Sequence, residues 1–208
     1  MSEEMSEEKG IAVLDKFYSF ALSGIGKEDT IKKVADYYLS KNNKSIMSAI
    51  KDFTNVQTLK CATTGFLTGL GGLITLPIAI PADVGGVLYV QLRMIMVIAY
   101  LGGHDVNSDK VKAFVYACLV GMSVNDITKQ VGIQMAGKLS ANLIKKIPYS
   151  VIKQINKAVG FRLVTKAGTK GLVNLTKWIP AISGVIGGAI DHAFTKSVAK
   201  RAIEMFIS

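Results

Sequence analysis

The sequence predicts an all-α fold, with a single helical domain built round a Gly-rich hydrophobic helical hairpin at about residues 61–103. Apolar residues recur at intervals of three and four along most of the chain, which places them on one face of a helix. No segment shows the convincing alternation of a strand, and no repeat of fixed period appears. Of the 208 residues, 50% are hydrophobic and 19% are charged, a composition that excludes an intrinsically disordered chain.

Three amphipathic helices are expected before the hairpin, after an acidic N-terminal tail at residues 1–9. Asp29 or Thr30 can cap the second of these helices, and Ser45 can cap the third, because a short polar side chain accepts a bond from a free N–H of the first turn. The expected bounds of the three helices are 10–23, 31–39 and 46–59.

The hairpin is the most apolar part of the chain. Residues 61–82 contain no charge, and their Gly-rich sequence leads to a second arm that begins near Pro81. Proline fits the first turn of a helix, and the pair Gly102 and Gly103 is a typical helix stop. The second arm is therefore expected to run as one helix to about Leu101.

Whether this hairpin spans a membrane stays open from the sequence. About 20 apolar residues suffice for a span, but Gln91 and Arg93 lie in mid-helix, and a central Arg costs about 3 kcal/mol on the insertion scale. Insertion is therefore near balance. Three outcomes remain: a buried core hairpin, a hairpin that inserts conditionally, and permanent spans.

The two charges of the hairpin, Asp83 and Arg93, need partners wherever they are buried. Ten helical residues, about 15 Å, separate them, so they cannot pair along one straight helix. The helix N-terminus is the expected partner of Asp83, and an acid elsewhere or a lipid phosphate that of Arg93. A pair that faces a ligand is the alternative.

Helices also account for the rest of the chain, with Pro148 and Pro180 as breaks. An apolar helix is followed by three basic helices and a C-terminal helix. Their expected bounds are 109–122, 126–146, 148–162, 165–178 and 181–206.

The charge is concentrated in this second part. The net charge is +10, yet residues 1–124 hold 12 basic and 12 acidic side chains, while residues 125–208 hold 13 and 3. No acid lies between Asp126 and Asp191. Lysines four and seven positions apart form stripes on helices whose other faces are apolar, as in peripheral membrane proteins. The candidate lipid contacts are Lys153, Lys157, Lys166, Lys170, Lys177 and Trp178.

An anionic membrane surface or lipid is the partner that this pattern favours, and a solvated face is the alternative. Nucleic acid is unlikely as a partner, because residues 127–190 hold nine Lys and one Arg, few aromatic residues and no recognition motif. The acidic N-terminus lacks the apolar core of a secretory signal, so a cytoplasmic location, at the inner face of the membrane, is expected.

Catalytic and cofactor motifs are not apparent in the sequence. The two histidines, His104 and His192, have no Cys or acid at ligand spacing, so neither a metal site nor a cofactor is expected, and the chain is expected not to be an enzyme. Cys61 and Cys118 sit among apolar residues, which favours two buried thiols over one disulfide.

The hairpin and the C-terminal segment resemble the EcsC protein family of bacteria. The matching positions are Ala62 to Gly65, Gly69 to Gly72, Leu76 to Asp83, Gln91 to Arg93, Ile98 to Asp105, and the tail residues Ile179, Pro180, Gly184, Gly187, Gly188, Asp191 and Ala199. The family is named after a product encoded beside an ABC transporter. The resemblance implies a membrane-associated helical protein, with a membrane protein as a possible partner. It singles out Asp83, Gln91, Arg93 and Asp105 as polar candidates for a site.

Three functions are compatible with these features. The first is a non-enzymatic, amphitropic helical protein that docks on anionic lipid, accessory to a membrane transport or envelope process. The second is a membrane-inserting, pore-forming effector, by analogy of architecture. The third is an enzyme that uses Asp83, Arg93 and His104.

Overall fold

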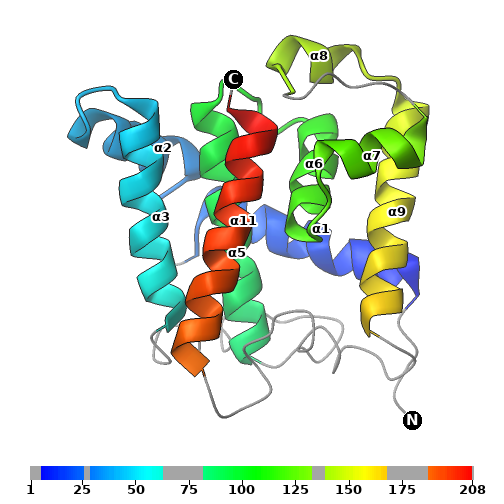
Figure 1. The fold of residues 1–208 in the computed structure, drawn as a ribbon, viewed down its shortest axis with the longest axis horizontal. Helices are drawn as coiled ribbons and strands as arrows, with labels where there is room; N and C mark the ends of the chain where they lie inside the picture. Colours follow the sequence, from blue (N-terminus) through cyan, green and yellow to red (C-terminus); the bar gives the residue numbers. More distant parts are fainter. Residues whose placement is uncertain (1–5, 26–28, 63–81, 133–138, 168–186, 208) are drawn as a thin grey trace.

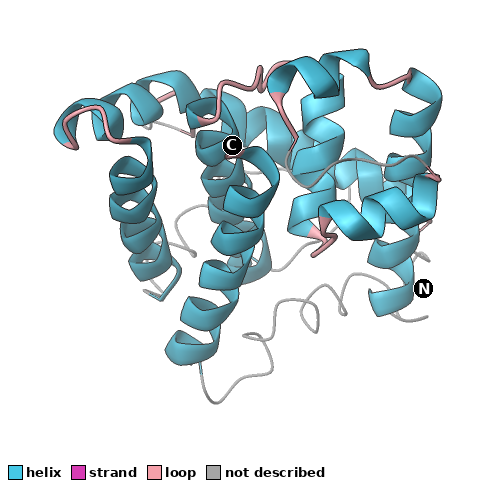
Figure 2. Ribbon diagram, turned by 45° about the horizontal axis from the view of Figure 1, so that its top comes forward, coloured by secondary structure: helices cyan, strands magenta, loops and turns pink. Residues whose placement is uncertain are grey.

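The all-α fold class is confirmed by a computed structural model, which describes residues 6–25, 29–62, 82–132, 139–167 and 187–207. These residues contain helices, turns and loops but no strand (Figures 1 and 2). The helices are α1 (Glu7–Ser23), α2 (Ile31–Lys41), α3 (Ile46–Ala62), α5 (Ala82–Leu101), α6 (Asp109–Leu119), α7 (Val124–Val131), α8 (Ala141–Lys146), α9 (Tyr149–Ala167) and α11 (Gly187–Phe206).

Helix α5 is the centre of the domain. Residues 85–99 are all buried, and α5 packs against α1, α2, α3, α6 and α11. It ends at Leu101 as predicted, and Gly103 adopts a φ of 81° that an L side chain rarely takes. The second arm of the predicted hairpin is therefore the core helix of the bundle. Most of the first arm, residues 63–81, lies outside the described residues.

Helices α3 and α11 pack side by side and run in opposite directions, with α11 in front of α5 and α3 to its left (Figure 1). Helix α11 also contacts α6, where the buried thiol of Cys118 donates to the carbonyl oxygen of Val198 at 3.9 Å. Cys118 is a free cysteine, which agrees with the predicted thiol.

Hydrogen bonds attach α1 to α6 and to the loop before it. The Tyr18 hydroxyl donates to the Val106 carbonyl at 2.7 Å, and the Tyr116 hydroxyl donates to Asp15 Oδ1 at 2.8 Å. Lys112 Nζ lies 3.1 Å from the same carboxylate oxygen. These polar groups satisfy one another, so the network fixes α1 in place against the core.

The prediction of one continuous basic helix over residues 126–146 is wrong. Helix α7 starts at Val124 and ends at Val131, because the C-cap Gly132 adopts a left-handed φ of 67° and donates its N–H to the Thr128 carbonyl at 3.0 Å. Residues 133–138 lie outside the described residues, and α8 is a separate helix of six residues.

Other helix ends also differ from the prediction. Helix α1 begins at Glu7 and not at Gly10, because the Ser6 hydroxyl accepts the Lys9 N–H at 3.1 Å and caps the helix inside the supposed tail. Helix α6 ends at Leu119, three residues early. Helix α9 runs without a break to Ala167, so the predicted ends at 162 and 165 are wrong.

None of the helices in the described ranges combines the length and the hydropathy that a membrane span needs. Helices α6 and α7 meet the criterion only together, and they are bent by 112° at the break between them.

Candidate functional site

Arg93 is bound by the fold itself. The residue is 5% exposed. Its guanidinium donates from Nη1 to the Ala21 carbonyl at 2.9 Å and from Nη2 to the Asp29 carbonyl at 2.7 Å, and it lies over the Tyr89 ring. Ala21 belongs to the last turn of α1, where carbonyl oxygens point out of the helix and carry its negative dipole end. Arg93 therefore joins the end of α1 and the start of α2 to the central helix.

Of the other polar candidates, Asp105 and Gln91 lie apart, because Asp105 is exposed in the loop after α5 and Gln91 is buried within α5. Asp105 is exposed, and its Oδ1 accepts the backbone N–H of Asn107 at 3.0 Å, which closes a turn before α6. Asp83 lies in the first turn of α5, but its side chain is outside the described part of the structure.

Gln91 is 1% exposed, and its Nε2 has no hydrogen-bond partner among the described residues. The hydroxyls of Thr54 on α3 and Thr195 on α11 share this state. Helices α3, α5 and α11, which pack against one another, thus each carry a buried polar atom without a partner in the described ranges.

His104 joins the end of α5 to the end of α11. It is buried, its Nε2 lies 3.1 Å from the Phe206 carbonyl oxygen, and the two rings meet edge to face. A carbonyl only accepts, so Nε2 carries the proton and donates. Nδ1 then has no partner among the described residues, and burial lowers the pKa of His104 below its usual value of 6.5.

Acidification is expected to destabilise the protein through His104. Its pKa is lower in the folded than in the unfolded state, so its contribution is full above pH 6.5 and is lost as the pH falls through 6.5 towards the folded pKa. Urea unfolding at pH 8 and pH 5 measures this loss. The variant His104→Gln, which keeps one N–H donor and does not titrate, should lose less stability over the same interval. Equal losses in the two proteins would rule out His104 as the cause.

Two of the predicted lysines lie on the surface of α9. Lys153 and Lys157 are exposed, and Tyr149 and Phe161 flank them at the same spacing of four residues with 63% and 54% of their areas exposed. This spacing places the four side chains, which we call the α9 stripe, on one side of the helix. The side chain of Lys166, and the residues Lys170, Lys177 and Trp178, lie outside the described part of the structure.

Residues 127–190 contain no acid, but acidic side chains from other helices lie beside the basic residues of α9. Helix α1 packs against α9, and Glu7, Glu8 and Asp15 line a pocket of about 380 Å³ together with Lys157. Arg162 Nη2 lies 4.0 Å from Asp126 Oδ2. Charge patterning along the sequence misses these neighbours because they come from other helices.

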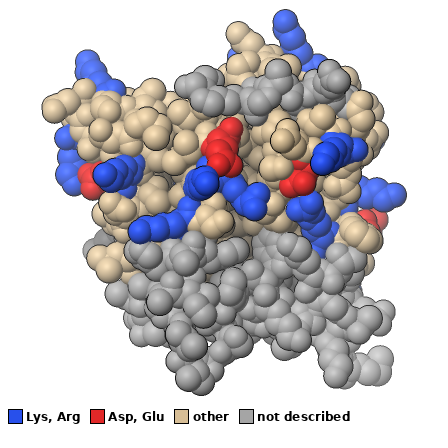
Figure 3. All heavy atoms as spheres, in the orientation of Figure 1, with Lys and Arg blue, Asp and Glu red and all other residues tan. Residues whose placement is uncertain are grey.

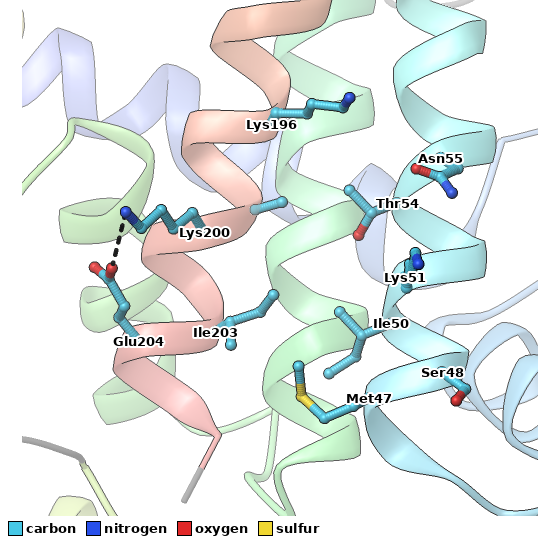
Figure 4. A pocket seen from close by; sticks show the side chains of 11 residues that line it. Met47, Ser48, Ile50, Lys51, Thr54, Asn55, Lys196, Lys200, Ile203 and Glu204 are labelled. Carbon is cyan, nitrogen blue, oxygen red and sulfur yellow. Dashed lines mark ion pairs between the residues drawn. The ribbon is translucent and has the colours of Figure 1, made fainter.

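A pocket larger than the one beside Lys157 lies between α3 and α11, and we call it the α3–α11 groove (Figure 4). Its volume is about 620 Å³. It is lined by Met47, Ser48, Ile50, Lys51, Thr54, Asn55, Lys196, Ala199, Lys200, Ile203 and Glu204. Neither Arg93 nor His104 lines it.

Sequence reasoning did not find this groove, because its two walls are separated by more than a hundred positions. The lysines Lys196 and Lys200 stand outside the acid-free stretch, so they were counted only in the net charge. Their spacing of four on the C-terminal helix is the local signal in the sequence that points to it.

The described residues contain no group of three or more His, Cys, Asp or Glu side chains that could hold a metal ion. The model of the EcsC protein family matches residues 5–207. No curated protein and no solved structure matches the chain.

Proposed function

The chain belongs to the EcsC protein family, and from this premise we propose that it is a non-enzymatic helical protein that docks peripherally on anionic lipid at the inner face of the membrane. In this role it is accessory to a membrane transport or envelope process, with a membrane protein as a further partner.

The α9 stripe is the observation that carries the proposal. Tyr149, Lys153, Lys157 and Phe161 combine exposed aromatic rings with exposed ammonium groups. Aromatic rings settle at the level of lipid head groups, and Lys side chains extend from there towards phosphates. Lys110 Nζ lies over the Tyr149 ring, 5.0 Å from its centroid, and adds a third ammonium group beside the stripe.

The wider surface supports the same partner. Lys and Arg atoms run across the face of the molecule drawn in Figure 3, with fewer Asp and Glu atoms between them. Four exposed lysines of α8 and α9, Lys145, Lys146, Lys153 and Lys157, contribute on the order of 4 kcal/mol at about 1 kcal/mol each. That corresponds to binding near the millimolar range, so docking by these lysines is weak, reversible and sensitive to salt.

Co-sedimentation with vesicles tests the proposal. The protein should pellet with anionic vesicles at low salt, and much less with neutral vesicles or at high salt. The double variant Lys146→Glu/Lys153→Glu should lower the partition coefficient about tenfold or more, because each reversal replaces attraction by repulsion. Lys157 is left unchanged because its acidic neighbours on α1 would repel a glutamate.

The matched control is Lys33→Glu/Lys44→Glu, which makes the same charge change at exposed positions on α2 and in the turn after it. It should retain most of the binding. Equal pelleting with neutral and anionic vesicles, or equal losses in the two double variants, would contradict docking through α8 and α9. Release of a dye trapped in the vesicles would indicate the pore-forming effector instead.

A further inference from the structure

The α3–α11 groove has a polar end and an end that holds most of its large apolar side chains. Thr54, Asn55 and Lys196 gather at the first end, and Met47, Ile50 and Ile203 line the second, where Ser48 and Lys51 also lie (Figure 4). Met47 and Asn55 are eight residues apart on α3, so the groove follows this helix for about 12 Å. The two ends thus offer separate environments to a ligand that is itself polar at one end and apolar along its length.

The hydroxyl of Thr54 is an independent sign of a ligand. Its side chain points from α3 into the space between the two helices (Figure 4), and the residue is only 8% exposed. Its Oγ1 has no hydrogen-bond partner among the described residues. A buried hydroxyl without a partner is costly, and a rotation of the Thr54 side chain that turns its hydroxyl to an acceptor in the groove would remove this cost.

The charges on the rim define what the acceptor is. Three lysines, Lys51, Lys196 and Lys200, line the groove together with one acid, Glu204, whose Oε1 lies 3.9 Å from Lys200 Nζ. The rim is therefore positive by two charges. Positive charge beside a hydroxyl donor favours an anionic head group over a neutral one.

We propose that the α3–α11 groove binds a medium-chain fatty acid anion, with its carboxylate at Thr54 and Lys196 and its alkyl chain along Met47, Ile50 and Ile203. The carboxylate accepts the Thr54 hydroxyl and faces the lysine, while the chain covers Met47 and Ile203, which are exposed and partly exposed, and lies beside the buried Ile50. The volume of about 620 Å³ lies within the range of small-molecule pockets.

This site is separate from the membrane contact proposed for α9. In Figure 1, α3 and α11 lie to the left and in the centre of the molecule, and α9 lies at the right. A protein that docks through α9 without binding fatty acid, or the reverse, is physically consistent. The two proposals can therefore fail independently.

Displacement of the fluorescent fatty acid cis-parinarate from the full chain tests the proposal. Dodecanoate, kept below its micelle concentration, should displace the probe with a stoichiometry of one, and 1-dodecanol should do so at least tenfold less well. Lys196→Glu should weaken dodecanoate binding about tenfold, since it places a negative charge beside the carboxylate. Lys129→Glu, at an exposed lysine of α7, should bind as the wild type does.

A second pair of variants tests the apolar end. Met47→Glu introduces a charge where the chain should lie, and about tenfold weaker binding is expected. Ile46→Glu makes the same change at the neighbouring exposed residue, which does not line the groove, and should have no effect. Both positions lie in the first turn of α3, where a glutamate suits the helix dipole and the fold tolerates it.

Three results would overturn the proposal. One is equal displacement by dodecanol and dodecanoate, and another is equal binding by Lys196→Glu and Lys129→Glu. The third is a dimer in sedimentation that Met47→Glu dissociates while no fatty acid binds, which would make the groove an interface between two copies. The Lys146→Glu/Lys153→Glu variant should still bind dodecanoate, even where it no longer pellets with vesicles.

Discussion

Replacing Gly102 with alanine is expected to lower the free energy of unfolding by about 3 kcal/mol, the upper range for overpacking a tight site. A Cβ at this position would lie 2.2 Å from the carbonyl oxygen of Phe206 and 3.2 Å from the ring of His104. The first neighbour is backbone and cannot turn aside, so the end of α11 must move away from α5. This movement also breaks the bond between His104 and Phe206. Urea unfolding followed by circular dichroism measures the loss.

The neighbouring glycine provides the control. Gly103 has a φ of 81°, but a Cβ there would meet nothing within 4 Å. Gly103→Ala carries only the conformational cost of a left-handed alanine, about 1 kcal/mol. Equal destabilisation by the two substitutions would mean that α11 does not approach Gly102 as closely as the structure has it.

The second large effect is expected for Arg93→Met, with a loss of about 2 to 3 kcal/mol. Methionine fills much of the space of the arginine stem, so the change removes mainly two charge-assisted hydrogen bonds and leaves the carbonyls of Ala21 and Asp29 with one partner fewer. Part of this loss of stability is offset, because the variant no longer carries the desolvation cost of a buried cation. Urea unfolding of the variant and the wild type gives the difference.

Arg93→Lys should be intermediate, because one ammonium group cannot easily reach two carbonyls on separate elements. Limited proteolysis distinguishes a local from a global effect. In Arg93→Met, cleavage between α1 and α2 should accelerate more than cleavage at other sites, since Arg93 joins the two ends of this connection to α5. A variant as stable and as resistant as the wild type would show that these bonds contribute nothing.

Helix ends that depend on local chemistry could be predicted from the sequence. Helix α5 ends at Leu101 because two glycines follow it, and Thr30 caps α2 with its own side chain. Gly132 was missed because a glycine inside a helical pattern is compatible both with continuation and with a left-handed cap. The end of α9 was also missed. Apolar residues keep their helical spacing beyond residue 162, but the prediction ended one helix there and began another at 165.

The partners of buried polar groups could not be predicted. The sequence indicated that Arg93 needs a partner, but not that two main-chain carbonyls distant in sequence provide it. The lysines of α9 were identified from their spacing, whereas the acids of α1 near Lys157 and the whole α3–α11 groove come from tertiary packing. Spacing within one helix is encoded locally, but the meeting of two helices is not.

The pairing of α3 with α11 also means that one helix is synthesised well before the helix it packs against. Ala62 and Gly187 are 125 positions apart, so at a synthesis rate of about 5–20 residues per second α3 leaves the ribosome roughly 6–25 seconds before its neighbour exists. During that interval the apolar sides of α3 and α5 lack the helix that covers them. Transiently exposed apolar surface of this kind is prone to aggregation, and the bundle closes only after α11 has been made.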